Sequence, residues 1–165
     1  MQEIGNTEYF LYIVKQRLCD QFVQTWQGRL EQSSRARFYN NISSFKLQPY
    51  FYTLNISKYR YVMSKLRMSS HKLHIETGRL SKPRTTPLNE RTWNNCNVIE
   101  DEFHFVLEDK LFTEIRNRYI PIFYRNHPSV YTLITLINNE NKNIIWNLGV
   151  FIQKAFELRN SIHYA

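Results

Sequence analysis

Apolar residues recur every three or four positions over long stretches of this chain. Near the N-terminus the repeat consists of Leu11, Val14, Leu18, Phe22, Trp26 and Leu30. Near the C-terminus it consists of Ile145, Leu148, Ile152, Ala155, Leu158 and Ile162. An α-helix turns once every 3.6 residues, so this spacing places the apolar side chains on one helical face. The pattern predicts an all-α fold, with Cys19 buried beside the first stripe.

Further helices are expected between these two ends of the chain. One is expected over "NISKYRYVMSKLRMSSH", and its inward stripe consists of Tyr59, Val62, Met63 and Leu66. Another is expected on five apolar residues spaced by four: Ile99, Phe103, Leu107, Leu111 and Ile115. Pro121 ends or kinks this helix, because proline lacks a backbone N–H. The stretch "GRLSKPRTTPLNERTWNN" is expected to be a basic loop, because prolines and polar turn formers interrupt it.

The length of the chain, 165 residues, suits one domain with one core. The expected architecture is a single compact domain over 1–165 with about five to seven helices. Its helical N-terminal part covers 8–75, its loop 78–95 and its helical C-terminal part 97–162. Gly78 is expected to end an ordered segment in a backbone conformation that other residues disfavour. Arg79 is then expected to reach an acid such as Glu76, Asp101 or Glu102.

The chain shows no sign of a membrane span or a secretory signal. No apolar run approaches the roughly 20 residues that cross a bilayer. The N-terminus has no basic start followed by an apolar stretch. The two cysteines, Cys19 and Cys96, do not make a disulfide framework. A reducing intracellular compartment, nuclear or cytoplasmic, is therefore expected.

The positive charge of the chain is concentrated in its middle third. The formal net charge is +8, yet the segment from Arg35 to Arg91 alone holds twelve Lys and Arg against two acids, Glu76 and Glu90. Such asymmetry favours an anionic partner, most often nucleic acid, although a solvated basic face without a ligand has the same composition.

Basic and aromatic residues alternate within this segment. Basic side chains neutralise phosphates, and exposed rings stack on unpaired bases, so the partner expected is RNA or single-stranded DNA. The interspersed rings are Tyr39, Tyr50, Tyr52, Tyr59 and Tyr61. The candidate nucleic-acid-binding residues are Arg35, Arg37, Lys58, Arg60, Lys65, Arg67, Lys72, Arg79, Lys82 and Arg84.

The stretch "ERTWNNCNVIEDEFHFVLED" holds half of a metal site. Structural zinc takes four Cys or His ligands in a tetrahedron. Here the spacing W-x2-C-x7-H-x4-D brings only Cys96 and His104, with Trp93 and Asp109 at the outer positions. Trp cannot ligate zinc, so no metal is expected and Trp93 is expected to fill the space with apolar volume. The open alternative is a site of Cys96, His104 and Asp109 completed by water.

Three stretches together resemble a known family. They are "SKLRMSSHKLHIETGR", "ERTW" followed by Cys96, and "IEDEFHFVLED". They are similar to the C-terminal region of non-LTR retrotransposon reverse transcriptases, and to host reading frames derived from them, over roughly Lys15 to Arg159. The resemblance implies zinc ligands at Trp93, Cys96, His104 and Asp109, of which two are replaced. It also implies handling of template or target nucleic acid rather than synthesis.

Catalytic motifs are not found in the sequence. There is no Y-x-D-D pair of carboxylates, no G-x-S-x-G and no glycine-rich phosphate loop. His71 and His74 are spaced for a metal, but further ligands are not specified, so both are interpreted as polar side chains at a helix end. We expect neither an enzyme nor a cofactor. The alternative to nucleic-acid binding is a structural or protein-interaction domain whose acidic helix, Glu100 to Glu114, meets a basic partner.

Overall fold

The fold is all-α, as the apolar spacing predicts. The computed structural model describes residues 3–163, and within them the only β-type pairing is an isolated bridge between Thr92 and Ile99. No helix in this part of the chain combines the length and the apolar character that a membrane crossing requires. The longer helices are α1 (Glu3–Gln32), α4 (Ser57–Arg67), α8 (Val130–Ile137) and α9 (Lys142–His163). The shorter ones are α2 (Arg37–Ile42), α3 (Tyr50–Thr53), α5 (His74–Leu80), α6 (Thr113–Tyr119) and α7 (Ile122–Asn126).

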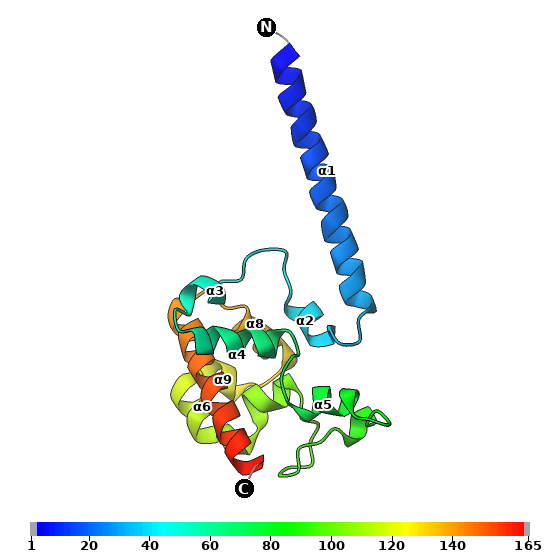
Figure 1. Ribbon diagram of the computed structural model, residues 1–165. Helices are drawn as coiled ribbons and strands as arrows, with labels where there is room; N and C mark the ends of the chain where they lie inside the picture. Colours follow the sequence, from blue (N-terminus) through cyan, green and yellow to red (C-terminus); the bar gives the residue numbers. More distant parts are fainter. Residues whose placement is uncertain (1–2, 164–165) are drawn as a thin grey trace.

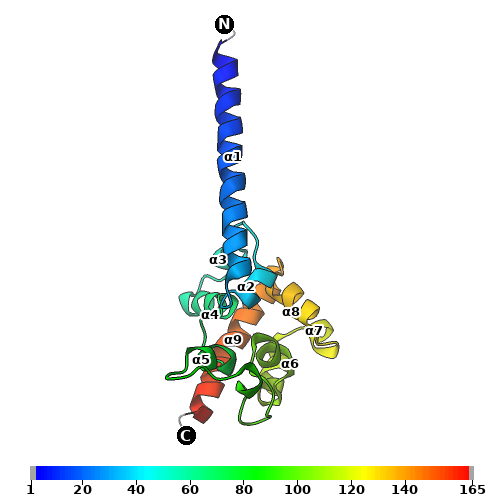
Figure 2. The same cartoon turned by 90° about the vertical axis from the view of Figure 1, so that its right-hand side faces the viewer.

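Helix α1 extends away from the rest of the molecule, which gathers at its C-terminal end (Figure 1). A view turned by 90° shows the same separation (Figure 2). The stripe on α1 is therefore not buried: Leu11, Leu18 and Phe22 are 59%, 61% and 59% exposed. Cys19 is exposed as well, so its predicted burial is wrong. Periodicity predicts which side chains share a face, but it does not specify what covers that face.

The core forms where α9 packs against α4, α6 and α3. The predicted stripe of α4 is confirmed, because Val62, Met63 and Leu66 are buried and Tyr59 is half-buried. Helix α9 likewise buries its stripe from Ile145 to Ala155, whereas Ile162 is exposed. Gly149 permits the close approach of α9, because a Cβ there would lie 3.2 Å from Leu54 Cδ1.

The single helix expected after residue 97 is wrong. The chain forms a π-helical turn, η2 (His104–Glu108), then a 3-10 turn, η3 (Lys110–Phe112), and then α6. A strict four-residue repeat drifts by about 40° per step around a straight α-helix, so five such residues cannot all face one core. The wider π turn and the break at Asp109, whose Oδ1 accepts a hydrogen bond from Leu111 N at 2.9 Å, redirect the chain.

The prediction for Pro121 is confirmed, because α6 ends at Tyr119 and α7 begins at Ile122. The following helix begins at Val130, two residues after Pro128. Its N-terminus is capped by Ser129, whose Oγ accepts a hydrogen bond from Thr132 N at 3.1 Å.

The region around Gly78 differs from its prediction. Gly78 lies inside α5 without a positive φ, so the prediction that an ordered segment ends there is wrong. The loop begins at Ser81 rather than at 78. Glycine is required there for space, because a Cβ would lie 2.7 Å from Arg91 Cγ. The predicted contact of Arg79 is confirmed, with Nη2 donating to Glu76 Oε2 at 2.7 Å. The loop carries one 3-10 turn, η1 (Leu88–Glu90).

Candidate nucleic-acid interface

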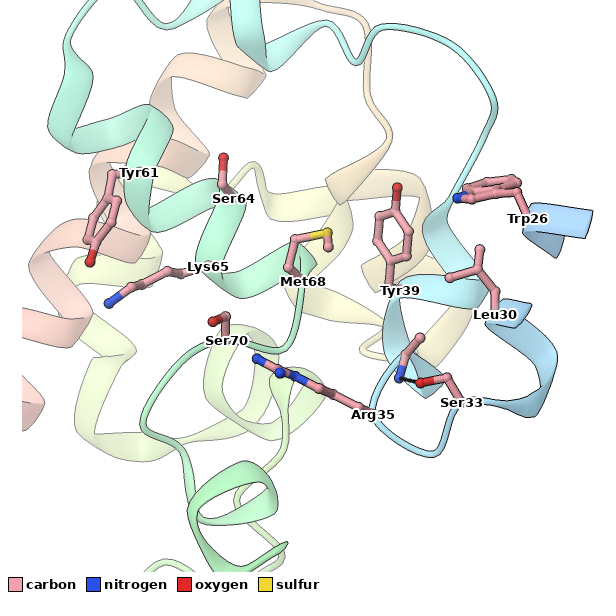
Figure 3. A pocket seen from close by; sticks show the side chains of 11 residues that line it. Trp26, Leu30, Ser33, Arg35, Tyr39, Tyr61, Ser64, Lys65, Met68 and Ser70 are labelled. Atoms are coloured by element: carbon pink, nitrogen blue, oxygen red, sulfur yellow. Dashed lines mark hydrogen bonds between the residues drawn. The ribbon is translucent and has the colours of Figure 1, made fainter. Parts of the chain in front are cut away.

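A groove of about 700 Å³ lies between the C-terminal end of α1, the segment that leads into α2, and α4 (Figure 3). It opens to solvent along the basic middle third of the chain. Its lining residues are Trp26, Leu30, Ser33, Arg35, Ala36, Tyr39, Tyr61, Ser64, Lys65, Met68 and Ser70. No Asp or Glu is among them, so the charge of the lining is positive.

Aromatic side chains enter the groove from three elements. Trp26 comes from α1, Tyr39 from α2 and Tyr61 from α4. In Figure 3 Tyr61 stands on the opposite side of the groove from Trp26. Phe45 holds the end of α1 in place, because its ring centroid lies 5.6 Å from that of Phe22 and 5.7 Å from that of Trp26. Tyr61 is largely exposed, so one face of its ring is available for stacking.

Two cations belong to the groove. Arg35 is exposed and is directed across the groove toward Ser70 in Figure 3. Lys65 is half-buried, and its Nζ lies 4.5 Å from the centroid of the Tyr61 ring. A cation held beside an exposed ring offers a phosphate and a base two neighbouring contacts.

The structure does not bring the other predicted basic residues into this groove. Arg60 is half-buried on α4, and Lys58 on the same helix lies over the ring of Tyr59 at 5.1 Å. Arg79 is half-buried and is held by Glu76. The remaining residues of the predicted set are exposed outside the groove: Arg37, Lys72, Lys82 and Arg84.

Arg67 is a structural residue, so its predicted role in nucleic-acid binding is wrong. Its side chain is 2% exposed. Nη1 donates to the backbone oxygen of Ile137 at 2.9 Å, and Nη2 donates to that of Ile42 at 3.1 Å. These carbonyls end α8 and α2, so Arg67 caps both helices. Burial lowers the pKa of this guanidinium from its usual value.

Two of the positions implied as zinc ligands meet in the structure. Cys96 Sγ lies 3.2 Å from His104 Nε2, and Asp109 Oδ2 lies 4.0 Å from the same nitrogen. The indole of Trp93 is 3% exposed and is covered by the guanidinium of Arg159, whose Cζ lies 4.7 Å from the ring. In residues 3–163 no three His, Cys, Asp or Glu side chains are arranged to hold a metal ion. The residues present therefore do not fit the closed zinc site of the family that the motifs resemble.

The acidic stretch at Glu100 lies inside the molecule. Glu100 pairs with Arg159, and Glu102 accepts hydrogen bonds from Ser69 Oγ at 2.8 Å and from His71 Nε2 at 2.9 Å, in the tautomer that donates there. Asp101 Oδ1 accepts from His104 N at 2.8 Å, and burial raises the pKa of this carboxyl. The first acids of the stretch that the interaction alternative requires are therefore occupied internally, whereas Glu108 and Glu114 are exposed.

The sequence interpretation missed the contribution of α1 to the groove. Trp26 and Leu30 continue the apolar stripe of α1, and the period of that stripe predicts a shared face but not a place in the groove. The signal for a different role is their place directly before the basic and aromatic stretch "SSRARFY". Comparisons with protein-family models, with curated proteins and with solved structures find no match for this chain. The resemblance to reverse transcriptases thus stays a prediction from the quoted motifs.

Proposed function

We propose that the protein is a non-catalytic module that binds single-stranded nucleic acid, RNA or DNA, in the groove between α1, α2 and α4. The observation that supports this function is the joint presence of three aromatic rings and two cations in one acid-free groove. Stacking of a base on an aromatic ring contributes about 1–3 kcal/mol, and it tolerates any sequence. Cations beside the rings neutralise phosphates and release counterions.

The basic face of α4 extends the groove along the helix. Lys58 and Lys65 are seven residues apart, which is two helical turns, so they lie on the same face. A strand that stacks on Tyr61 can therefore meet a second lysine as it follows α4. Binding of this kind needs no base-specific hydrogen bonds, so we expect little sequence preference.

The resemblance of the motifs to the C-terminal region of reverse transcriptases fits the same role. In that family the region accompanies a polymerase, and its expected task is to hold template or target nucleic acid. A nuclear or cytoplasmic location, where RNA and DNA occur, follows from this proposal.

Titration of labelled single-stranded RNA and DNA, followed by fluorescence anisotropy, tests the charge contribution. The variant Arg35→Glu/Lys65→Glu is expected to bind at least about tenfold more weakly at low salt, because two phosphate contacts become repulsive. Lys142→Glu/Lys154→Glu is the matched control, since it changes the same charge at exposed sites on α9 outside the groove. Equal losses in both variants, or no binding by the wild type at about 50 mM salt, contradict the proposal.

Salt dependence and aromatic variants test the binding mode. If three to five cations meet phosphates, log K should fall against log[salt] with a slope of about −2 to −4. Tyr61→Ala should weaken binding about tenfold through the loss of one stacked base. Tyr131→Ala is its control, because Tyr131 is more exposed than Tyr61 and does not line the groove. A Tyr61→Ala variant that binds as the control does would exclude stacking on this ring.

A further inference from the structure

The N-terminal two thirds of α1 has an apolar face that is largely uncovered, although Phe45 packs on its last residue, Phe22. At 100° per residue, Leu11, Val14, Leu18 and Phe22 lie within about 40° of one line along the helix. Among the described residues, α1 packs only at its C-terminal end, against α2 and Phe45. Phe10 and Tyr12 flank the start of this face and Tyr9 lies on the opposite side of the helix, and all three side chains are exposed.

An apolar stripe of this length marks an interaction surface. Burial of apolar area contributes about 25 cal/mol per Å², and a folded protein rarely leaves so large a contiguous patch in water. A helix that makes no tertiary contacts over most of its length also has little to stabilise it. A partner that covers the stripe buries its apolar area and also provides the tertiary contacts that stabilise the helix.

The charges of α1 identify the partner. We propose that the stripe is covered by α1 of a second copy of this chain, running antiparallel and centred between Leu18 and Cys19. In this register Glu8 stands level with Arg29 of the second copy, on the same flank of the pair. By symmetry this pair occurs twice. No two like charges of α1 stand level with each other.

The apolar residues match in the same register. Leu11 stands level with Trp26 of the second copy, and Leu18 stands beside its own symmetry mate. Leu11 and Leu18 are thus opposite apolar side chains, and Phe22 stands level with Lys15, whose alkyl stem can lie along the ring. A parallel pair in register would instead place Glu8 against Glu8 and Arg17 against Arg17, which disfavours it.

The shape of the molecule also favours the antiparallel arrangement. All the other helices gather at the C-terminal end of α1 (Figures 1 and 2). A parallel pair would bring two of these bodies to the same end of the pair. An antiparallel pair places them at opposite ends of a helix of 30 residues, which is about 45 Å long at 1.5 Å per residue.

Sedimentation equilibrium of the full chain tests the oligomeric state. The wild type should have twice the monomer mass of 20.1 kDa. Leu11→Glu/Leu18→Glu should be monomeric, because two charges then enter each copy of the stripe. Gln16→Glu/Gln27→Glu is the matched control, since both residues lie on the opposite face of α1 and the dimer should persist. A wild type that is monomeric at about 100 μM, where even a micromolar complex forms, overturns the proposal.

A charge reversal tests the register without replacing an apolar residue. Glu8→Arg and Arg29→Glu should each raise the dissociation constant of the dimer about tenfold, because both symmetric pairs become repulsive. The double variant Glu8→Arg/Arg29→Glu should return to within about threefold of the wild type, because the pairs re-form with exchanged signs. A double variant that is weaker than either single one excludes this antiparallel register, and a dimer that survives Leu11→Glu/Leu18→Glu excludes the stripe as its interface.

Discussion

Arg159 of α9 holds Glu100 through two hydrogen bonds, from Nε to Oε1 at 2.6 Å and from Nη2 to Oε2 at 2.9 Å. Both side chains are almost fully buried. Glu100 Oε2 also accepts from the backbone N of His74 at 2.7 Å. The pair therefore ties the last helix to the start of α5 and to the segment that leads into the π-helical turn.

Loss of the Arg159 charge should be costly. We expect Arg159→Met to lower the free energy of unfolding by about 3–5 kcal/mol, because Glu100 is left buried with an uncompensated charge. Glu100→Gln in the same background should recover part of this loss, since the neutral amide still accepts from His74 N. Urea unfolding of the two single variants and the double variant measures the coupling. If the changes in unfolding free energy of the two single variants add up to that of the double variant, Arg159 and Glu100 do not act as a coupled pair.

Gly78 should resist substitution for reasons of space. A Cβ would lie 2.7 Å from Arg91 Cγ, and Arg91 is held by donation from Nε to Thr86 O at 2.9 Å and from Nη1 to Ile75 O at 3.0 Å. Overpacking costs about 1–3 kcal/mol, against a gain of about 1 kcal/mol in helix propensity. We expect Gly78→Ala to lower stability by about 1 kcal/mol in thermal or urea unfolding.

Arg91→Ala provides the control for this variant. With the Arg91 side chain removed, Gly78→Ala should become neutral or stabilising by up to about 1 kcal/mol, because the gain in helix propensity then opposes only the milder contact with Thr86 Cβ at 3.2 Å. A loss of equal size in both backgrounds would show that the contact with Arg91 is not the cause.

The sequence predicted the helices of the core better than the environment of α1. On α4 and α9 the apolar face meets other helices, so the buried residues follow from the period alone. On α1 the same period occurs without a cover inside the molecule. The repeat of four between Ile99 and Ile115 predicts one helix, but its drift spreads the five side chains over about 160°, and the π turn and the break at Asp109 redirect the chain instead.

The candidate site was predicted in part. The mixture of basic and aromatic residues pointed to Arg35, Lys65, Tyr39 and Tyr61, which the groove brings together. The charge of a side chain does not specify whether it points into the core or into solvent, and this explains the wrong prediction for Arg67. That residue lies four positions after Met63, one turn further on the buried face of α4. Its spacing therefore indicates burial, although its charge suggests an exposed side chain.

Asp101 should make stability depend on pH. Burial raises the pKa of its carboxyl above the ordinary value of 3.8, so the folded state binds the proton more tightly than the unfolded state. Its contribution to stability is present below the ordinary pKa and is lost as pH rises through the raised, folded-state pKa. Asp101→Asn keeps an acceptor for His104 N but cannot titrate. The stability of the wild type relative to this variant should therefore grow as pH falls from about 7 to about 4.

Urea unfolding over this pH range measures the effect. Asp101→Ala is the control for the hydrogen bond, and it should lose about 0.5–2 kcal/mol, as other helix N-caps do. Parallel pH profiles for the wild type and Asp101→Asn would show that the carboxyl does not titrate differently in the two states.

The half metal site at Cys96 should become a metal site when two residues are changed. Ligands of tetrahedral zinc, at bond lengths of about 2.0–2.3 Å, lie roughly 3.3–3.8 Å from one another. Cys96 Sγ and His104 Nε2 are already 3.2 Å apart, and Asp109 Oδ2 lies 4.0 Å from His104 Nε2. Trp93 O accepts from Cys96 N at 3.2 Å and from Asn97 N at 2.8 Å, which forms a tight turn between positions 93 and 96.

The double variant Trp93→Cys/Asp109→Cys should therefore bind one equivalent of cobalt and show the absorption of a tetrahedral thiolate site. Removal of the buried indole costs about 3–5 kcal/mol, so the metal-free variant should be less stable than the wild type. Zinc should raise its melting temperature, because metal binding adds to the free energy of folding. Trp93→Ser/Asp109→Ser is the matched control, and it should lose the same stability without gaining a response to metal. If the cysteine variant takes up no cobalt, positions 93 and 109 are not those of the ligands in the family that the motifs resemble.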